Sequence, residues 1–241
     1  MRIITNIVLA SILFSVASSV AAPPEGFSRE FLAGDWGEII GMQPTGDGRY
    51  IAWERTGILW LVGDDGSMSM EPMLDISEEV GAWRDHGLLG FTADPNFLTN
   101  GYIYLMYVVD RHHLLNFGTP AYDSKTDEYS AASIARITRY TANADSNFET
   151  VDPTSRFILI GEDIDSGFPI LHQSHAVGSL SFGDDGTLLG SMGDSASYLA
   201  TDTGGQTDGG WVDQALSDGI LNSDENIGAF RAQYLNSLCG K

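Results

Sequence analysis

Residues 46–66 read GDGRYIAWERTGILWLVGDDG, and this stretch decides the fold class. It contains two apolar runs, Tyr50–Glu54 and Ile58–Val62, which are joined through Thr56-Gly57 and bounded by Asp-Gly pairs. Short apolar runs separated by Gly and Asp are typical of antiparallel strands connected by tight turns. The sequence therefore predicts a β-hairpin at this position.

The same pattern returns further along the chain. Asn100-Gly101 precedes the apolar run 102–107, and Ser133–Tyr140 mixes apolar and polar residues as a half-exposed strand does. Residues 179–192 contain two further runs around a Gly-Asp-Asp-Gly turn. Repeated short strands without alternating helices indicate an all-β propeller, sandwich or barrel. We expect four-stranded antiparallel sheets that follow one another as blades.

Some segments do not follow this pattern. Residues 111–131 are polar, and residues 195–229 are rich in Gly, Asp, Ser and Thr, so both are expected to be irregular. Residues 77–80 and 212–216 are expected to form brief helical turns. No low-complexity linker divides the chain into two domains.

Composition excludes several classes of function. The chain has 241 residues, 12 Lys+Arg against 33 Asp+Glu, a net charge of −21 and 43% hydrophobic residues. This hydrophobic content is sufficient for a packed core. Binding to nucleic acid or to an anionic membrane surface requires clustered cations, which an acidic chain of this kind does not supply. The single cysteine, Cys239, excludes an intrachain disulfide.

The N-terminus has the features of an export signal. Met1-Arg2 is followed by the mostly apolar run Ile7–Val16 and by the small-x-small motif Ser19-Val20-Ala21. The apolar run is too short for a comfortable membrane span. We expect a signal peptide over residues 1–22, a propeller domain over 23–241, and a secreted or periplasmic protein without a membrane span. The alternative is a buried N-terminal helix.

Residues 83–107 read WRDHGLLGFTADPNFLTNGYIYLMY. This block resembles the signature of the pyrroloquinoline-quinone (PQQ)-dependent sugar dehydrogenases, the soluble glucose and sorbosone dehydrogenase family. Residues 47–66, 175–194 and 236–241 resemble further family blocks, in the same order. The matches span nearly all of residues 35–241.

The resemblance implies a six-bladed β-propeller in which PQQ lies over the central mouth beside Ca²⁺. A closed propeller of this type needs a longer chain, so about the first three blades are expected here, as an N-terminal fragment. Most ligands of PQQ and Ca²⁺ would then lie beyond residue 241. The fragment alone is expected to be inactive.

The resemblance also implies a role for His175, whose place in its motif is that of the general base acting on the sugar C1 hydroxyl. Hydride would pass from the sugar to PQQ. A neutral imidazole is a suitable proton acceptor near pH 7. The alternative is that His175 only caps a strand through its backbone.

Two positions depart from the glucose-oxidising members. Ser174 stands where those members have Asp, and Asp85 stands where they have Gln. Asp85 and Ser174 are the candidate cofactor contacts, and no metal ligand is assigned. The partners implied are a small sugar and an electron acceptor, with no nucleic acid. The predicted function is oxidation of an aldose or related sugar; the alternative is a non-catalytic extracellular propeller domain that binds carbohydrate or protein.

Other patterns are weaker. His172 and His175 are three residues apart, and on a strand such residues point to opposite faces, which argues against a metal pair. His112-His113 is expected in a solvated loop. The acidic residues of 161–165 offer hard oxygen ligands for Ca²⁺, but a solvated acidic turn is favoured because no further spaced ligands follow.

Overall fold

The computed structural model describes residues 22–32, 34, 36–204 and 210–241. The chain divides into two compact units, Met1–Leu32 and Ala33–Lys241. In the first unit the described residues contain one turn, in which the Phe27 amide donates to the Pro24 carbonyl at 3.0 Å. The predicted signal peptide lies almost entirely outside the described residues. All strands and helices among the described residues lie in the second unit.

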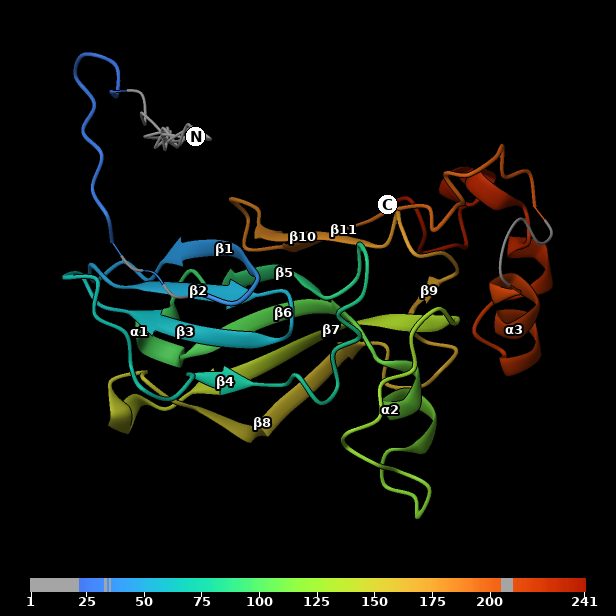
Figure 1. The fold of residues 1–241 in the computed structure, drawn as a ribbon, viewed down its shortest axis with the longest axis horizontal. Helices are drawn as coiled ribbons and strands as arrows, with labels where there is room; N and C mark the ends of the chain where they lie inside the picture. The colour runs from blue at the N-terminus through green and yellow to red at the C-terminus, as the bar shows by residue number, and fades with distance from the viewer. Residues whose placement is uncertain (1–21, 33, 35, 205–209) are drawn as a thin grey trace, which may run out of the picture. The chain divides into compact units, whose positions relative to one another are not determined.

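The first sheet has four antiparallel strands in chain order (Figure 1). They are β1 (Ile39–Pro44), β2 (Tyr50–Glu54), β3 (Ile58–Val62) and β4 (Leu74–Asp75). The predicted hairpin is β2 and β3, with the expected bounds. Its tight link requires Gly57, whose φ of +98° is readily adopted only by glycine.

The second sheet is also antiparallel, with the order β5-β6-β7-β8 and with β9 paired to the start of β7. A short helix, α1 (Phe97–Asn100), connects the first two strands. The strands are β5 (Leu88–Ala93), β6 (Tyr102–Val108), β7 (Ser133–Ala142), β8 (Val151–Ile160) and β9 (Phe168–Ile170).

The third sheet is the hairpin of β10 (Val177–Phe182) and β11 (Leu188–Met192). The expectation of consecutive antiparallel sheets is confirmed. Four strands are found in the first sheet, five in the second, and two in the third within the described residues.

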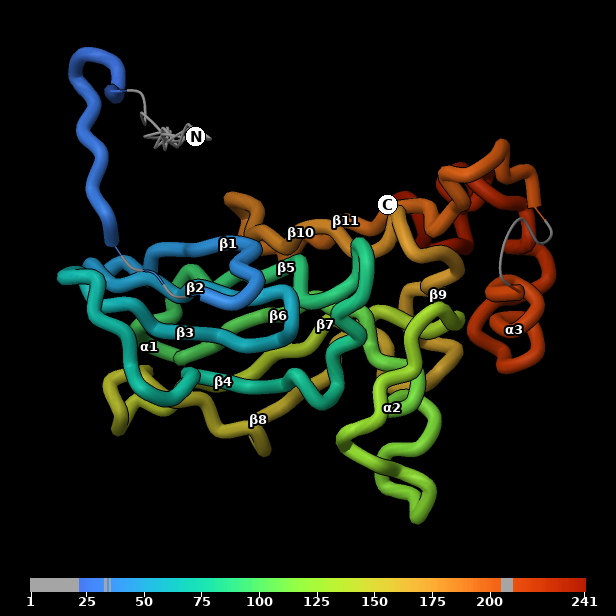
Figure 2. Tube along the Cα trace, viewed as in Figure 1, coloured from blue at the N-terminus to red at the C-terminus, as the bar shows by residue number. Residues whose placement is uncertain are grey.

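The structure differs from two of the expectations about where helices occur. The segment 111–131 is not wholly irregular, because it begins with α2 (Arg111–Asn116), and Figure 2 shows the chain continuing from this helix through a loop towards β7. The Asp110 side chain caps α2 by accepting the amide hydrogens of His112 and His113. Residues 77–80 form a turn and not a helix. The helical turn expected at 212–216 lies within α3 (Trp211–Asp218).

The C-terminal part, residues 195–229, is less irregular than expected. After α3 come two 3₁₀ helices, η2 (Ser223–Glu225) and η3 (Gly228–Gln233). An earlier one, η1 (Ala144–Ser146), lies between β7 and β8.

Strand β6 lies between two hydrophobic cores. Its residues Ile103, Leu105 and Tyr107 belong to the core shared with the first sheet. Met106 and Val108 belong to the core shared with β10 and β11. Side chains alternate across a strand, so this arrangement places the second sheet between the other two, as neighbouring blades are stacked.

A charged cluster is buried beside the first of these cores. The Glu79 carboxylate accepts from Arg136 and Arg156 at 2.6 Å each and from the Tyr107 hydroxyl at 2.8 Å. Burial, followed by the charge of Glu79, raises the pKa of Tyr107 well above its ordinary value. The phenol therefore stays protonated and donates to the carboxylate.

Candidate active site

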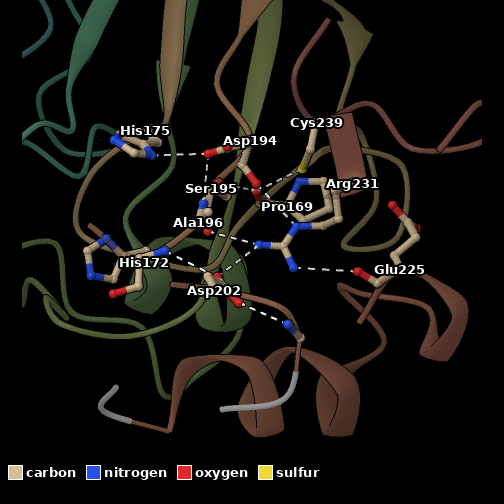
Figure 3. A network of polar contacts seen from close by, with 12 residues as sticks. Pro169, His172, His175, Asp194, Ser195, Ala196, Asp202, Glu225, Arg231 and Cys239 are labelled. Atoms are coloured by element: carbon tan, nitrogen blue, oxygen red, sulfur yellow. Dashed lines mark hydrogen bonds and ion pairs between the residues drawn. The ribbon is translucent and has the colours of Figure 1, made fainter. Parts of the chain in front are cut away.

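The third sheet brings His175 and Asp194 together. Val177 at the start of β10 pairs with Met192 at the end of β11. Two residues outside this pair, on either side of the hairpin, His175 Nδ1 lies 3.1 Å from Asp194 Oδ1 (Figure 3). The pair therefore follows from strand register, across 19 positions of sequence.

The backbone of His175 is held in an unusual conformation. Its φ is +56°, in the left-handed region that few non-glycine residues adopt. The Ser195 amide donates to the His175 carbonyl at 2.9 Å, and the Gly193 amide donates to Ala176 at 2.7 Å. A Cβ atom at Gly193 would collide with the His175 carbonyl, so only glycine fits there. Strained residues of this kind cluster at functional sites.

The geometry fixes how the imidazole can act. The Asp194 carboxylate only accepts, so His175 donates from Nδ1, and in the neutral ring Nε2 is left without a proton. The side chain of His175 is 49% exposed and that of Asp194 is 27% exposed. The ring can therefore accept a proton from a molecule in solvent.

The Asp85-His86 segment lies beside the chain that leads to His175. The Asp85 amide donates to the Gln173 carbonyl at 3.3 Å, and His86 Nε2 lies 2.9 Å from the His172 carbonyl. A carbonyl accepts, so His86 carries its proton on Nε2. Burial lowers the pKa of His86 and favours the neutral ring. The Asp85 side chain is exposed.

Ser174 has a different role from the one its place in the motif indicates. Its side chain is buried, and its hydroxyl lies 2.8 Å from His172 Nδ1. It therefore orients His172 and is not directed to His175. The nearest aromatic neighbour of His172 is Tyr198, whose ring meets the imidazole edge-on at 5.3 Å between centroids.

Gln173, two residues before His175, contacts an exposed aromatic side chain. Gln173 donates to the Tyr198 hydroxyl at 3.0 Å, and the Tyr198 ring is largely exposed. Further in, Trp83 and Trp211 stack with their centroids 6.3 Å apart. An exposed aromatic ring beside amide and hydroxyl groups is suited to a carbohydrate, which offers both apolar faces and hydroxyls.

The described residues fit PQQ and Ca²⁺ only in part. His175 offers an imidazole that can accept a proton, whereas the carboxylates of PQQ call for cations. Arg231 is buried against carbonyls, Arg55 is paired with Glu38 at 2.6 Å, and Arg84 lies over the Trp83 ring at 5.5 Å. Within the described part of the chain, no three His, Cys, Asp or Glu side chains are placed to hold a metal ion.

The comparison with family models decides the assignment. The glucose/sorbosone dehydrogenase model matches residues 37–228, which is most of the chain. The chain belongs to this family. It contains both the His175 loop and the Asp85 segment within the matched range.

Two relatives match part of this chain. The chain is 27% identical over 162 residues to Hedgehog-interacting protein of Homo sapiens, covering 64% of this chain and 20% of that protein. It is 26% identical over 198 residues to the HIPL1 protein of Arabidopsis thaliana, covering 71% of this chain and 27% of that protein. The chain thus spans about a fifth to a quarter of the length of these relatives.

A solved structure shares the fold. The PQQ-bound aldose sugar dehydrogenase of Streptomyces coelicolor aligns with a TM-score of 0.51 at 18% identity, over 70% of this chain and 41% of that chain. The expected fold class is confirmed: an all-β chain of the family's β-propeller type, comprising part of its blades. No helix among the described residues is long and apolar enough to cross a membrane.

Sequence reasoning selected both His175 and Asp85 as candidate site residues, and their segments lie side by side. It missed the role of Asp194, although Gly193-Asp194 was part of the matched block. It also missed Arg231, which is fully buried behind Asp194. A lone arginine in a polar stretch gives no signal of this kind before the fold is known.

Proposed function

We propose that this chain carries the catalytic base of a sugar-oxidising quinoprotein, and that His175 is that base. The observation that supports the proposal is the contact of 3.1 Å between His175 Nδ1 and Asp194 Oδ1 on an exposed loop. A histidine oriented by a carboxylate is the common arrangement of a general base.

In the proposed reaction, Nε2 of His175 takes the proton of the substrate hydroxyl. The C–H bond of the same carbon breaks, and its hydride goes to a two-electron acceptor, leaving a carbonyl product. Asp194 stabilises the imidazolium that forms, as a fixed negative charge next to a developing positive one. This supplies the stabilising carboxylate that the sequence lacks at Ser174.

The proposed acceptor is PQQ, which supplies a quinone that takes up two electrons when bound. Asp85 stays the proposed contact to the cofactor or substrate, because its exposed side chain lies on the segment next to His175. Ser174 is instead proposed to support the loop through His172. The Ca²⁺ site is not assigned to any described residue.

The proposed substrate is an aldose or a related sugar. The exposed Tyr198 ring and the Gln173 amide that binds its hydroxyl are suited to the apolar face and hydroxyls of a pyranose, and Gln173 lies two residues before His175. The acidic chain, with a net charge of −21, disfavours anionic sugars such as sugar phosphates.

The test is sugar-dependent dye reduction with added PQQ and Ca²⁺. The chain spans 41% of the solved dehydrogenase, so the assay uses the product of the complete coding sequence in which this chain lies. We expect His175→Ala to lower turnover about 10²- to 10⁴-fold, the usual contribution of a general base. His112→Ala, on the distant helix α2, is the matched control and should retain activity.

The second candidate is a non-catalytic extracellular propeller domain that binds protein or carbohydrate. It is favoured by the 27% identity to a relative whose name describes an interaction with Hedgehog. If the PQQ-loaded protein oxidises no sugar, this candidate takes the place of the first. Equal rates in the wild type and His175→Ala would instead leave an enzyme in which His175 is structural.

Export is part of the proposal. We propose that residues 1–22 are removed and that the domain over 23–241 acts outside the cytoplasm, on the strength of the Ser19-Val20-Ala21 motif. N-terminal sequencing of the exported protein should give a start within two residues of Ala22. A sequence that begins at Met1 would refute it.

A further inference from the structure

Arg231 contacts the backbone of Asp194, the residue whose carboxylate binds His175. Its side chain is 1% exposed and comes from η3. Its Nε donates to the carbonyl of Asp194 at 3.2 Å, and a terminal nitrogen donates to the carbonyl of Ser195 at 3.1 Å (Figure 3). One planar guanidinium therefore binds two consecutive carbonyls of the segment that carries Asp194.

The buried charge of Arg231 is balanced by Asp202, which faces the same terminal nitrogen that binds the Ser195 carbonyl. A terminal nitrogen lies 3.8 Å from Oδ2 of the buried Asp202, and another donates to the Glu225 carbonyl at 3.5 Å. Asp202 in turn accepts the amides of Ser197 and Gly204 at 3.2 Å each. Arg231 and Asp202 thus connect the helices η3 and η2 to the segment 194–204.

Two hydrogen bonds fix the orientation of the Asp194 side chain. Its Oδ1 accepts the Ala196 amide at 3.0 Å as well as His175 Nδ1 at 3.1 Å. Ser195 is strained at a φ of +52°, and its hydroxyl donates to the Pro169 carbonyl at 2.8 Å. Strain of this kind persists only where surrounding contacts hold the backbone, and those contacts include Arg231.

We propose that Arg231 is a positioning residue for the His175–Asp194 pair. By fixing the Asp194 and Ser195 carbonyls, it keeps Asp194 Oδ1 against His175 Nδ1 and so holds the imidazole in the tautomer whose Nε2 is free. The catalytic meaning of this tautomer rests on the proposed function. The tautomer itself does not, and it is measured without substrate or cofactor.

Lysine cannot replace arginine in this role. The two carbonyls are bound by Nε and a terminal nitrogen of one rigid, planar group, whereas an ammonium is a point charge on a flexible stem. Arg231→Lys keeps the charge opposite Asp202 and loses the paired geometry. It therefore separates positioning from simple charge compensation.

The test is the tautomer of His175, read from its ¹⁵N chemical shifts in the full chain labelled at its five histidines. His175→Gln assigns the signal. In the wild type at a pH where the ring is neutral, we expect the proton on Nδ1. In Arg231→Lys we expect a mixture with the Nε2–H form, since the partner of Nδ1 is no longer fixed.

The matched control is Arg111→Lys. Arg111 is also buried, at 6% exposure against 1% for Arg231, binds the Ala132 carbonyl and pairs with Asp218 at 2.7 Å, but belongs to α2. This variant should leave the His175 tautomer unchanged. A folded Arg231→Lys variant with the wild-type tautomer would overturn the proposal, as would an equal change in Arg111→Lys.

A second variant covers the case in which Arg231→Lys does not fold. Asp202→Asn removes the counter-ion and keeps an acceptor oxygen for an amide, and it should shift the tautomer in the same direction. No shift in the folded Asp202→Asn variant would then overturn the proposal. In an active protein, Arg231→Lys should lower kcat with little change in KM. Absence of any sugar oxidation would remove the proposed function and leave the tautomer result standing.

Discussion

Glu79 and Arg136 form a buried ion pair at 2.6 Å. Glu79 lies in the link that leaves β4, and Arg136 lies on β7. The same carboxylate also binds Arg156 on β8, so one negative charge holds two cations of the second sheet. The pair therefore fixes the link after β4 to the second sheet through charge, next to the apolar core that the first two sheets share.

Glu79→Gln should destabilise the protein by about 3–5 kcal/mol, because it leaves two partly or fully buried arginines without a counter-ion. Urea unfolding monitored by circular dichroism measures the change. Glu38→Gln is the control: Glu38 pairs with Arg55 but is 56% exposed. Exposed pairs contribute about 0–1 kcal/mol, so a similar loss in both variants would contradict the buried role of Glu79.

Gly193→Ala should cost about 1–3 kcal/mol, the usual effect of forcing atoms into filled space, because the added Cβ meets the His175 carbonyl. Thermal unfolding gives the stability, and the same variant should disturb the His175 loop. Gly190→Ala on the neighbouring strand meets only side-chain atoms, the nearest at 3.3 Å, and should cost much less. A Gly193→Ala protein as stable as wild type would show that the loop yields freely.

Asp47 should make stability depend on pH in acid. Its hydrogen bond with Arg49 is the main cause that lowers the pKa of this carboxyl from 3.8 to about 2. A lowered folded-state pKa gives stability that is complete above the unfolded value and is lost as the pH falls from about 4 towards 2. Asp47→Asn should lack this loss. The difference in free energy of unfolding between the two proteins, measured from pH 5 to pH 2, should therefore shrink.

Cys239 should be unreactive in the folded protein. Burial raises the pKa of its thiol to about 11, so almost no thiolate is present at pH 8. A thiol reagent such as DTNB should react slowly with the native chain and at once after unfolding in guanidinium chloride. Rapid reaction of one thiol per native chain would contradict the buried position.

The sequence predicted those strands whose apolar pattern is bounded by turns, as in β2 and β3. It did not predict β8, because half of its residues are exposed and it contains Asp152 and Pro153, which give no strand pattern. Helix α2 was missed because it is short and is capped by a single side chain, that of Asp110. Such contacts depend on a few atoms and not on a repeated pattern.

The same limit applies to the site. His175 could be found because it stands in a motif, whereas its partner Asp194 was recognisable only through the pairing of Val177 with Met192. The contact of the Ser174 hydroxyl with His172 could not be read from its place in the chain. Side chains of adjacent residues on an irregular loop can point in unrelated directions, and the sequence gives no signal for those directions.

Strand β6 has a consequence for how the chain finds its pairing. A slip of one residue against β5 or β7 would exchange Leu105 with Met106 and move every side chain of β6 into the opposite core. Neither the first nor the third sheet could then pack against the second. A register error in β6 would therefore disrupt both hydrophobic cores. The middle blade therefore serves as the template against which the other two are aligned.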